Sequence, residues 1–150
     1  MTNLEILDSI RSLISSTPDA TSLLIEVVSM LRRERHHYHW VGVYLLHGDE
    51  LVLGPYLGKP TAHTRIPLHQ GICGAAASAG QTLIVDDVNA DPRYLACSLE
   101  TRSEIVVPIQ HQGRVLGEID IDSDQLAAFT HEDRDLLEAV AALLAEKIEP

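Results

Sequence analysis

The sequence predicts a single α+β domain in which a central, mainly antiparallel sheet is flanked by helices. Two observations carry this prediction: segments with helical spacing lie at both ends of the chain, and β-rich segments are grouped between them. A chain of 150 residues can bury roughly 70% of the surface that its unfolded form exposes, so one domain is the simplest organisation. We expect N-terminal helices within residues 1–37, a sheet with its loops over 39–129 and a C-terminal helix over 130–149.

Two helices are expected in the N-terminal part of the chain. The first covers residues 3–15, and the second covers 18–35, where apolar residues recur at helical spacing. The segment Thr17-Pro18-Asp19 is interpreted as a helix start with proline at the first helical position, rather than as a domain linker. Basic residues at positions 32–35 indicate the end of the second helix, because cations complement the carbonyl end of a helix.

The middle of the chain has the residue pattern of a β-sheet. Six segments read as strands: residues 39–46, 50–56, 64–67, 82–85, 104–110 and 114–122. Between the third and fourth, residues 71–80 predict a short helix of small residues with glycine at both ends. Thr130-His-Glu-Asp133 then has the pattern of a helix cap, so the C-terminal helix is expected to begin there.

Charge and hydropathy exclude several classes of protein. The net charge of −11, from 11 basic and 22 acidic residues, argues against a nucleic-acid partner, which requires clustered Lys and Arg. No run approaches the roughly 20 apolar residues of a membrane span, and the N-terminus has neither the basic flank nor the apolar stretch of a signal peptide. We therefore expect a cytoplasmic protein that handles cations, zwitterions or another protein.

Acidic and apolar residues alternate along the last two expected strands. Because side chains on a strand point alternately to opposite faces, one face, which we expect to be the core face, carries Ile105, Val107, Ile109, Ile119 and Ile121. Four acids fall on the other face: Glu104, Glu118, Asp120 and Asp122. A three-residue turn, His111-Gln112-Gly113, would place Glu104 directly opposite Asp120, whereas a two-residue turn would mix the faces.

Opposed like charges on a sheet are destabilising, so this acidic face requires an explanation. A solvated sheet face, a metal site and a pocket for an organic cation such as an amino-acid ammonium group are three alternatives. Periodicity alone favours the solvated face, since half-exposed antiparallel strands are common. The pocket gains support from Cys97, which lies seven residues before Glu104 in a polar loop, where an inert thiol is unusual.

The second cysteine, Cys73, falls in the first turn of the expected short helix. There the helix dipole can stabilise a thiolate and lower the pKa of the thiol, although simple packing among small residues is the alternative. The tract Arg35-His36-His37-Tyr38-His39 lacks a fixed ligand geometry, and we interpret these histidines as surface residues. We expect no metal and no cofactor, because no phosphate loop, Ser-His-Asp order or CxxC motif is present.

Seven short segments between Trp40 and Phe129 occur together in one order: WVGVYL (40–45), LVLGPY (51–56), RIPLHQGICG (65–74), IVDDV (84–88), YLAC (94–97), SEIVVPI (103–109) and GEIDIDS (117–123). In these motifs and in the spacing of its cysteines, the chain resembles the free methionine-(R)-sulfoxide reductases, a branch of the GAF-domain superfamily. The resemblance implies a GAF fold, which often forms a homodimer. It also implies that free methionine-(R)-sulfoxide binds beside Trp40, with its ammonium group among Glu104, Asp120 and Asp122.

The same resemblance implies an oxidoreductase that works through thiols. A thiolate attacks the sulfoxide sulfur, methionine leaves, and the resulting sulfenic acid is converted to a disulfide that a thioredoxin-type protein reduces. Cys97 matches the usual nucleophile of the family, and Cys73 is the other active-site thiol. A protonated acid near the sulfoxide oxygen would assist the reaction.

One position departs from the family pattern. Many members carry a third cysteine ten residues before the one that matches Cys73, and this chain has His63 there. Imidazole cannot form a disulfide, so either Cys73 resolves the sulfenic acid, an external thiol does, or catalysis is lost. The rival hypothesis is therefore a noncatalytic GAF module that binds a small molecule or senses redox state.

Overall fold

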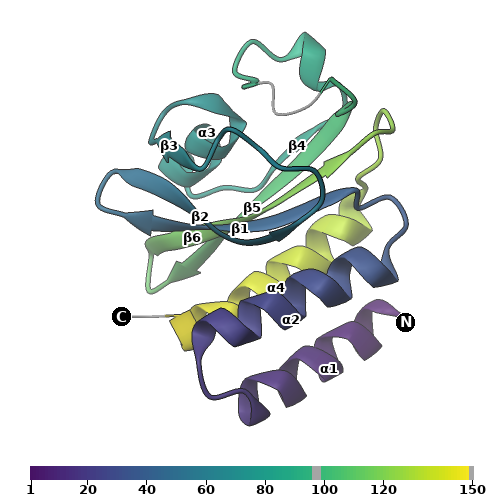
Figure 1. Cartoon of the computed structure of the whole chain (residues 1–150), viewed down its shortest axis with the longest axis vertical. Helices are drawn as coiled ribbons and strands as arrows, with labels where there is room; N and C mark the ends of the chain where they lie inside the picture. Colours follow the sequence, from purple (N-terminus) through teal and green to yellow (C-terminus); the bar gives the residue numbers. More distant parts are fainter. Residues whose placement is uncertain (96–98, 149–150) are drawn as a thin grey trace.

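The computed structural model describes residues 1–95 and 99–148, and its centre is a six-stranded antiparallel sheet with helices on both faces (Figure 1). The strand order is β3-β2-β1-β6-β5-β4, and every neighbouring pair is antiparallel. The strands are β1 (Trp40–His47), β2 (Glu50–Leu57), β3 (Arg65–Pro67), β4 (Leu83–Val85), β5 (Ser103–His111) and β6 (Arg114–Ser123). The helices are α1 (Asn3–Ser16), α2 (Ala20–Glu34), α3 (Gly71–Ala79) and α4 (His131–Ile148), with a 3-10 turn at Val88–Ala90. The predicted α+β fold with a mainly antiparallel sheet is confirmed.

The predicted helices occur with small shifts at their ends. The largest correction concerns α2, which begins after Asp19 because the Asp19 carboxylate accepts a 2.7 Å hydrogen bond from the backbone of Ser22. Pro18 therefore precedes the cap, and its predicted place at the first helical position is wrong. In the part of the chain that the structure describes, no helix has both the length and the apolar composition needed to span a membrane.

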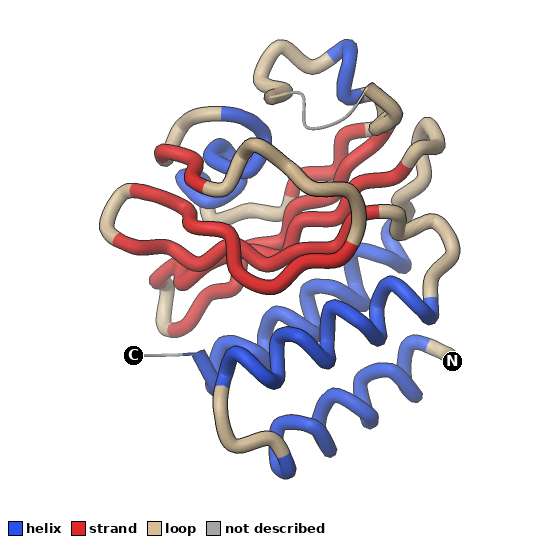
Figure 2. The backbone as a smooth tube through the Cα atoms, in the orientation of Figure 1, coloured by secondary structure: helices blue, strands red, loops and turns tan. Residues whose placement is uncertain are grey.

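The sheet separates two apolar layers of different size. Helices α2 and α4 pack on one face with α1 outside them, while α3 lies over the other face near the edge strand β3 (Figures 1 and 2). The larger layer contains Ile105, Val107, Ile109, Ile119 and Ile121, as the alternation along the strands predicted. The smaller layer lies beneath α3 and contains Trp40, Tyr44 and Val106. The face that carries the acids is therefore the face that α3 covers.

The β5–β6 hairpin has a different register from the predicted one. His111 pairs with Arg114, so the turn consists of Gln112 and Gly113 alone, both with positive φ (52° and 78°) as in a two-residue hairpin turn. Ile109 pairs with Gly117 while Gln110 pairs with Val115, which leaves one extra residue on β6 as a β-bulge. The bulge restores the alternation of faces that a two-residue turn alone would disrupt. Glu104 consequently lies opposite Asp122, and the predicted pairing with Asp120 is wrong.

A polar cluster attaches the start of α4 to the segment before β1. The carboxylate of Asp133 accepts hydrogen bonds from Tyr38 Oη at 2.6 Å and from the backbone of Thr130 at 2.9 Å. His37 Nε2 lies 2.9 Å from the same carboxylate, and His39 Nδ1 accepts a 2.9 Å hydrogen bond from the backbone of Asp124. The interpretation of the histidine tract as surface residues therefore holds only for the exposed His36.

Candidate active site

The acidic face of β5 and β6 is buried. The exposed fractions are 5% for Glu104, 0% for Glu118, 3% for Asp120 and 4% for Asp122. The prediction that these side chains lie away from the main core is confirmed, but the explanation as a solvated sheet face is wrong. Helix α3 contacts β5 and β6 and covers this part of the sheet (Figure 1).

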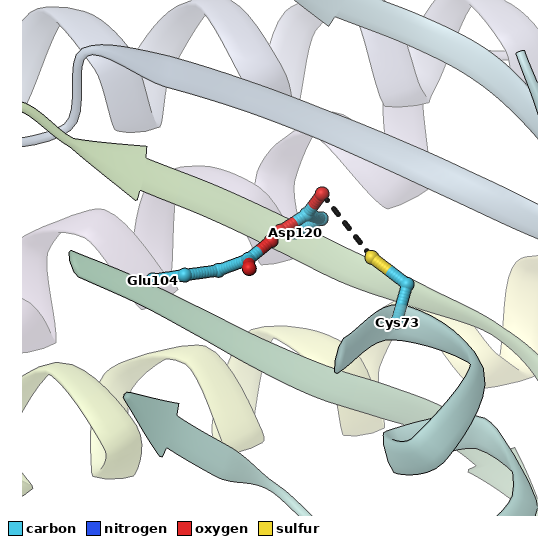
Figure 3. Close-up of side chains that lie close together, drawn as sticks. All are labelled: Cys73, Glu104 and Asp120. Atoms are coloured by element: carbon cyan, nitrogen blue, oxygen red, sulfur yellow. Dashed lines mark hydrogen bonds between the residues drawn. The ribbon is translucent and has the colours of Figure 1, made fainter. Parts of the chain in front are cut away.

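Cys73 reaches the acids from the first turn of α3. Its Sγ donates a 3.3 Å hydrogen bond to Oδ2 of Asp120, and the side chain of Glu104 points toward the same carboxyl group (Figure 3). One ligand atom from each of Cys73, Glu104 and Asp120 lies within 4.8 Å of the others. Gly74 lets α3 pack closely against the end of β3, because a Cβ at this position would lie 3.0 Å from the backbone oxygen of Pro67. The structure thus brings one predicted thiol and two predicted acids together.

Burial controls the charge state of the acids. It raises the pKa of Glu104 well above its usual range, and the charges of Asp120 and Asp122 add to this effect. Burial also raises the pKa of Asp120, while hydrogen bonds from Glu104 and Cys73 act in the opposite direction. These effects favour a proton on Glu104, shared with its neighbours, and the negative charge on Asp120.

The pKa of Cys73 contradicts the sequence-based expectation. Burial raises the pKa of this thiol well above its usual value, and electrostatic interactions with the carboxyl groups of Asp120, Glu118 and Glu104 raise it further. The expectation that the helix N-terminus lowers this pKa is therefore wrong. A helix end supplies only about half an elementary charge, which does not offset desolvation and three nearby carboxyl groups. Cys73 is a protonated thiol in this environment.

Several carboxyl oxygens in this cluster lack a hydrogen-bond partner within residues 1–95 and 99–148. They are both side-chain oxygens of Glu118, Oδ1 of Asp120 and Oδ1 of Asp122. None of the four acids forms an ion pair with a basic residue in the described part of the chain. Buried polar atoms without partners are rare in folded proteins, and here the three acids that carry them alternate along β6 on one face of the sheet. Glu118 was absent from the predicted site, although the alternation along β6 placed it on the acidic face.

A small cavity and a larger cleft are lined by predicted site residues. Glu104, Asp120 and Cys73 line a small cavity of about 20 Å³, together with Tyr44 and His63. This volume accommodates about one water molecule or one ammonium group. Asp122 and Trp40 line a larger cleft of about 510 Å³ instead. Because Asp122 lies opposite Glu104 across the β5–β6 pair, the row of acids leads from the cleft to the small cavity.

Trp40 forms part of the wall of the larger cleft. Its ring stacks on Tyr56 with 5.5 Å between centroids, and Nε1 donates a 3.0 Å hydrogen bond to the backbone carbonyl of Lys59. A Cβ on Gly42 would lie 2.4 Å from the indole ring, and one on Gly58 would lie 2.6 Å from it. The two glycines therefore make room for the indole beside the acids.

Two positions singled out in the sequence remain, Cys97 and His63. Cys97 lies outside the described residues, so its role and its distance from Cys73 stay predictions. His63 lines the same small cavity as Cys73, and its backbone carbonyl accepts a 2.7 Å hydrogen bond from Tyr44 Oη. The position at which many relatives have a third cysteine therefore belongs to the wall of this cavity.

Comparisons with known proteins agree with this architecture. A family model for the GAF domain matches residues 19–148. The free methionine-R-sulfoxide reductase of Escherichia coli (strain K12) is 35% identical over 92% of this chain and 82% of its own length. The enzyme of the same name from Saccharomyces cerevisiae is 46% identical over 71% of this chain, which spans 61% of the yeast protein.

A solved structure gives the same result in three dimensions. The free methionine-R-sulfoxide reductase of Neisseria meningitidis, determined in complex with its substrate, superimposes with a TM-score of 0.92. The two sequences are 38% identical, and the match covers 97% of this chain and 87% of the other. These matches agree with the fold and with the buried thiol–carboxylate cluster. The chain belongs to the free methionine-R-sulfoxide reductase family of GAF-domain proteins.

Proposed function

We propose that this protein reduces free L-methionine-(R)-sulfoxide to methionine with electrons from thiols. The observation that carries the proposal is the buried cluster of carboxyl groups that contacts Cys73 and has no basic partner among the described residues. A cationic ligand would donate hydrogen bonds to the unpartnered oxygens and offset the negative charge that the cluster carries. The named relatives supply the choice of an amino-acid sulfoxide as that ligand.

The ammonium group of the substrate fits the small cavity. Glu104 and Oδ1 of Asp120 line this cavity and can accept two of the three N–H groups, and Asp122, which lies opposite Glu104, can accept the third from the side of the larger cleft. The cavity of about 20 Å³ is too small for the rest of the molecule. The remainder of the substrate therefore extends toward Trp40 and the cleft of about 510 Å³.

In the first chemical step, the thiolate of Cys97 attacks the sulfoxide sulfur. The sulfur–oxygen bond of the substrate breaks, the oxygen is transferred to the cysteine, and the products are methionine and a cysteine sulfenic acid. A proton is needed on the transferred oxygen, and a protonated carboxyl group of the cluster would supply it, since burial raises the pKa of these acids. The substrate is reduced by two electrons and the cysteine is oxidised by two.

In the second step, Cys73 resolves the sulfenic acid. Its thiol displaces water from the sulfenic acid and forms a Cys73–Cys97 disulfide, and a thioredoxin-type protein then returns the pair to two thiols. Because burial raises the pKa of Cys73, this thiol must lose its proton before it attacks, and the assignment of Cys97 as first nucleophile rests on the resemblance to the family. Asp120, which accepts the hydrogen bond of Cys73, is the nearest acceptor for the thiol proton. We place this cycle in the cytoplasm, in a homodimeric enzyme.

Separate epimers of free methionine sulfoxide test the proposal. The purified protein is incubated with each epimer and with dithiothreitol or thioredoxin, and methionine is quantified by chromatography. We expect repeated turnover of the R epimer and little of the S epimer. Absence of turnover with both reductants would contradict the proposal and favour a noncatalytic GAF module.

A further inference from the structure

We propose that Cys73, Asp120 and Glu104 also form a binding site for a thiophilic divalent cation, for which zinc is the best fit, and that the bound ion blocks the site. The inhibitory consequence rests on the proposed function, whereas binding of the ion does not. The three side chains come from α3, β6 and β5, so the fold rather than one segment builds the site (Figure 3).

The distances between the donor atoms suit a tetrahedral ion. Zinc binds a cysteine sulfur at about 2.3 Å and a carboxylate oxygen at about 2.0 Å, so tetrahedral angles place the two ligands about 3.5 Å apart. Cys73 Sγ lies 3.3 Å from Oδ2 of Asp120. The third ligand atom, from Glu104, lies within 4.8 Å of both, so only a small side-chain movement is needed to contact the same ion. Water can occupy the fourth position.

A second observation independently indicates a cation. Asp120 is 3% exposed, and its Oδ1 has no hydrogen-bond partner within the described residues. Glu118 and Asp122 are equally buried on the same strand and each has at least one oxygen without a partner. These two acids would surround the ligands with further negative charge, which strengthens the binding of a divalent ion.

The donor set and the cavity select against the common hard cations. Magnesium and calcium prefer six or more oxygen ligands, and magnesium usually keeps several of its waters. A cavity of about 20 Å³ that presents a thiol cannot supply such a shell. Zinc, by contrast, accepts mixed sulfur and oxygen ligands with a coordination number of four.

Binding of the ion would remove the groups that the reaction needs. The carboxyl oxygens proposed to hold the substrate ammonium would contact the metal, and the Cys73 thiol would no longer be available to resolve a sulfenic acid. Zinc and free methionine sulfoxide should therefore compete for one site. Raising the concentration of either ligand should lower the apparent affinity of the other.

Equilibrium dialysis of the chelator-treated protein with zinc chloride tests the proposal. The protein is kept reduced with a phosphine, because dithiothreitol itself binds zinc. We expect one tightly bound zinc per chain, with affinity lowered at least about tenfold by Cys73→Ser and by Asp120→Asn. Asp49→Asn is the matched control, because Asp49 is exposed and far from the cluster in sequence, and it should bind zinc like the wild type. Circular dichroism confirms that each variant is folded.

Cobalt absorption identifies the thiol that binds. Cobalt bound through a thiolate gives a ligand-to-metal charge-transfer band, which we expect in the wild type and in Cys97→Ser, where Cys73 is the one remaining cysteine. Loss of the band in Cys97→Ser, or unchanged zinc affinity in Cys73→Ser, would overturn the proposal and place the ion elsewhere, for example on the histidines before β1. An enzyme that reduces the sulfoxide without binding zinc would refute this proposal alone. A protein that binds zinc through Cys73 but turns over neither epimer would refute the proposed function and leave the metal site standing.

Discussion

Asp120 is the residue at which the thiol, the second acid and the cavity meet. It accepts the hydrogen bond of Cys73, lies beside Glu104 and lines the small cavity. Hydrogen bonds from both neighbours favour its ionised form against the effect of burial on its pKa. A negative charge at this point would bind the ammonium group of the substrate and orient Cys73 at the same time.

Replacing Asp120 with asparagine removes this charge with almost no change in shape. We expect the KM for free methionine-(R)-sulfoxide to rise about 10–100-fold, since a hydrogen bond to a charged group contributes about 1.5–3 kcal/mol. Stability should be unchanged or slightly higher, because repulsion among the acids is relieved. Steady-state kinetics and thermal denaturation measure the two effects, with Asp49→Asn as the control. Loss of folding without a specific rise in KM would make Asp120 a structural residue.

Glu118 allows a prediction about pH and stability. Burial raises the pKa of this carboxyl group well above its usual value, and the charge of Asp120 raises it further. A group whose pKa is raised on folding contributes its full stability below its unfolded pKa and loses it as the pH rises through the folded pKa. Glu118 should therefore destabilise the protein increasingly from about pH 4.5 upward.

The variant Glu118→Val replaces the carboxyl group with an apolar side chain of similar volume and high strand propensity. Because both oxygens of Glu118 lack partners in the described structure, we expect the free energy of unfolding at pH 7 to rise by about 1–3 kcal/mol. The gain should shrink as the pH falls toward 4, where the wild-type carboxyl group is neutral in both states. Urea denaturation at several pH values measures this, and a gain independent of pH would contradict the assigned cause.

Asp133 connects the start of α4 to the segment that leads into β1. We expect Asp133→Ala to lower the free energy of unfolding by about 2–4 kcal/mol, because the buried Tyr38 hydroxyl and the Thr130 amide lose their acceptor. Asp135→Ala removes an exposed carboxylate from the same helix turn and should change stability by less than about 0.5 kcal/mol. Chemical denaturation compares the two variants, and equal effects would show that the Asp133 cluster contributes little.

The predicted cooperation of the two thiols joins Cys73 of α3 to Cys97, which lies outside the described residues. We expect Cys97→Ser to abolish sulfoxide reduction, whereas Cys73→Ser should still release about one methionine per chain and leave a sulfenic acid on Cys97. In the wild type, substrate without reductant should produce a Cys73–Cys97 disulfide, identified by peptide mass spectrometry. If Cys73→Ser prevents even the first release of methionine, the roles of the two cysteines are reversed.

The faces of the strands could be predicted from the sequence, whereas their register and the burial of the acids could not. Alternation along a strand has a period of two, so it correctly placed Glu104 and the three acids of β6 on one face. The register depended on one turn and one bulge, and the sequence does not show that Leu116 is the extra residue. Burial of the acids depends on α3, which approaches from a distant part of the chain, so periodicity alone favoured a solvated face. The pKa of Cys73 was misjudged for the same reason.

In the whole molecule, the sheet holds a thiol and a row of acids between a small cavity and a larger cleft. The cavity suits a cationic group, and the cleft leaves room for the rest of a small amino acid. This arrangement explains why the proposed substrate is a free amino acid rather than a residue within a peptide, in which the nitrogen is an uncharged amide. Recognition of the ammonium group by the buried acids would therefore decide which sulfoxides the protein accepts.

The most direct test compares free methionine-(R)-sulfoxide with its N-acetyl derivative in the wild-type enzyme. Acetylation keeps the sulfoxide and the carboxylate but removes the positive charge and two N–H donors. We predict that kcat/KM falls at least about 100-fold, because the acids are left buried without a cation. Equal kcat/KM for the two compounds would contradict recognition of the ammonium group by Glu104, Asp120 and Asp122.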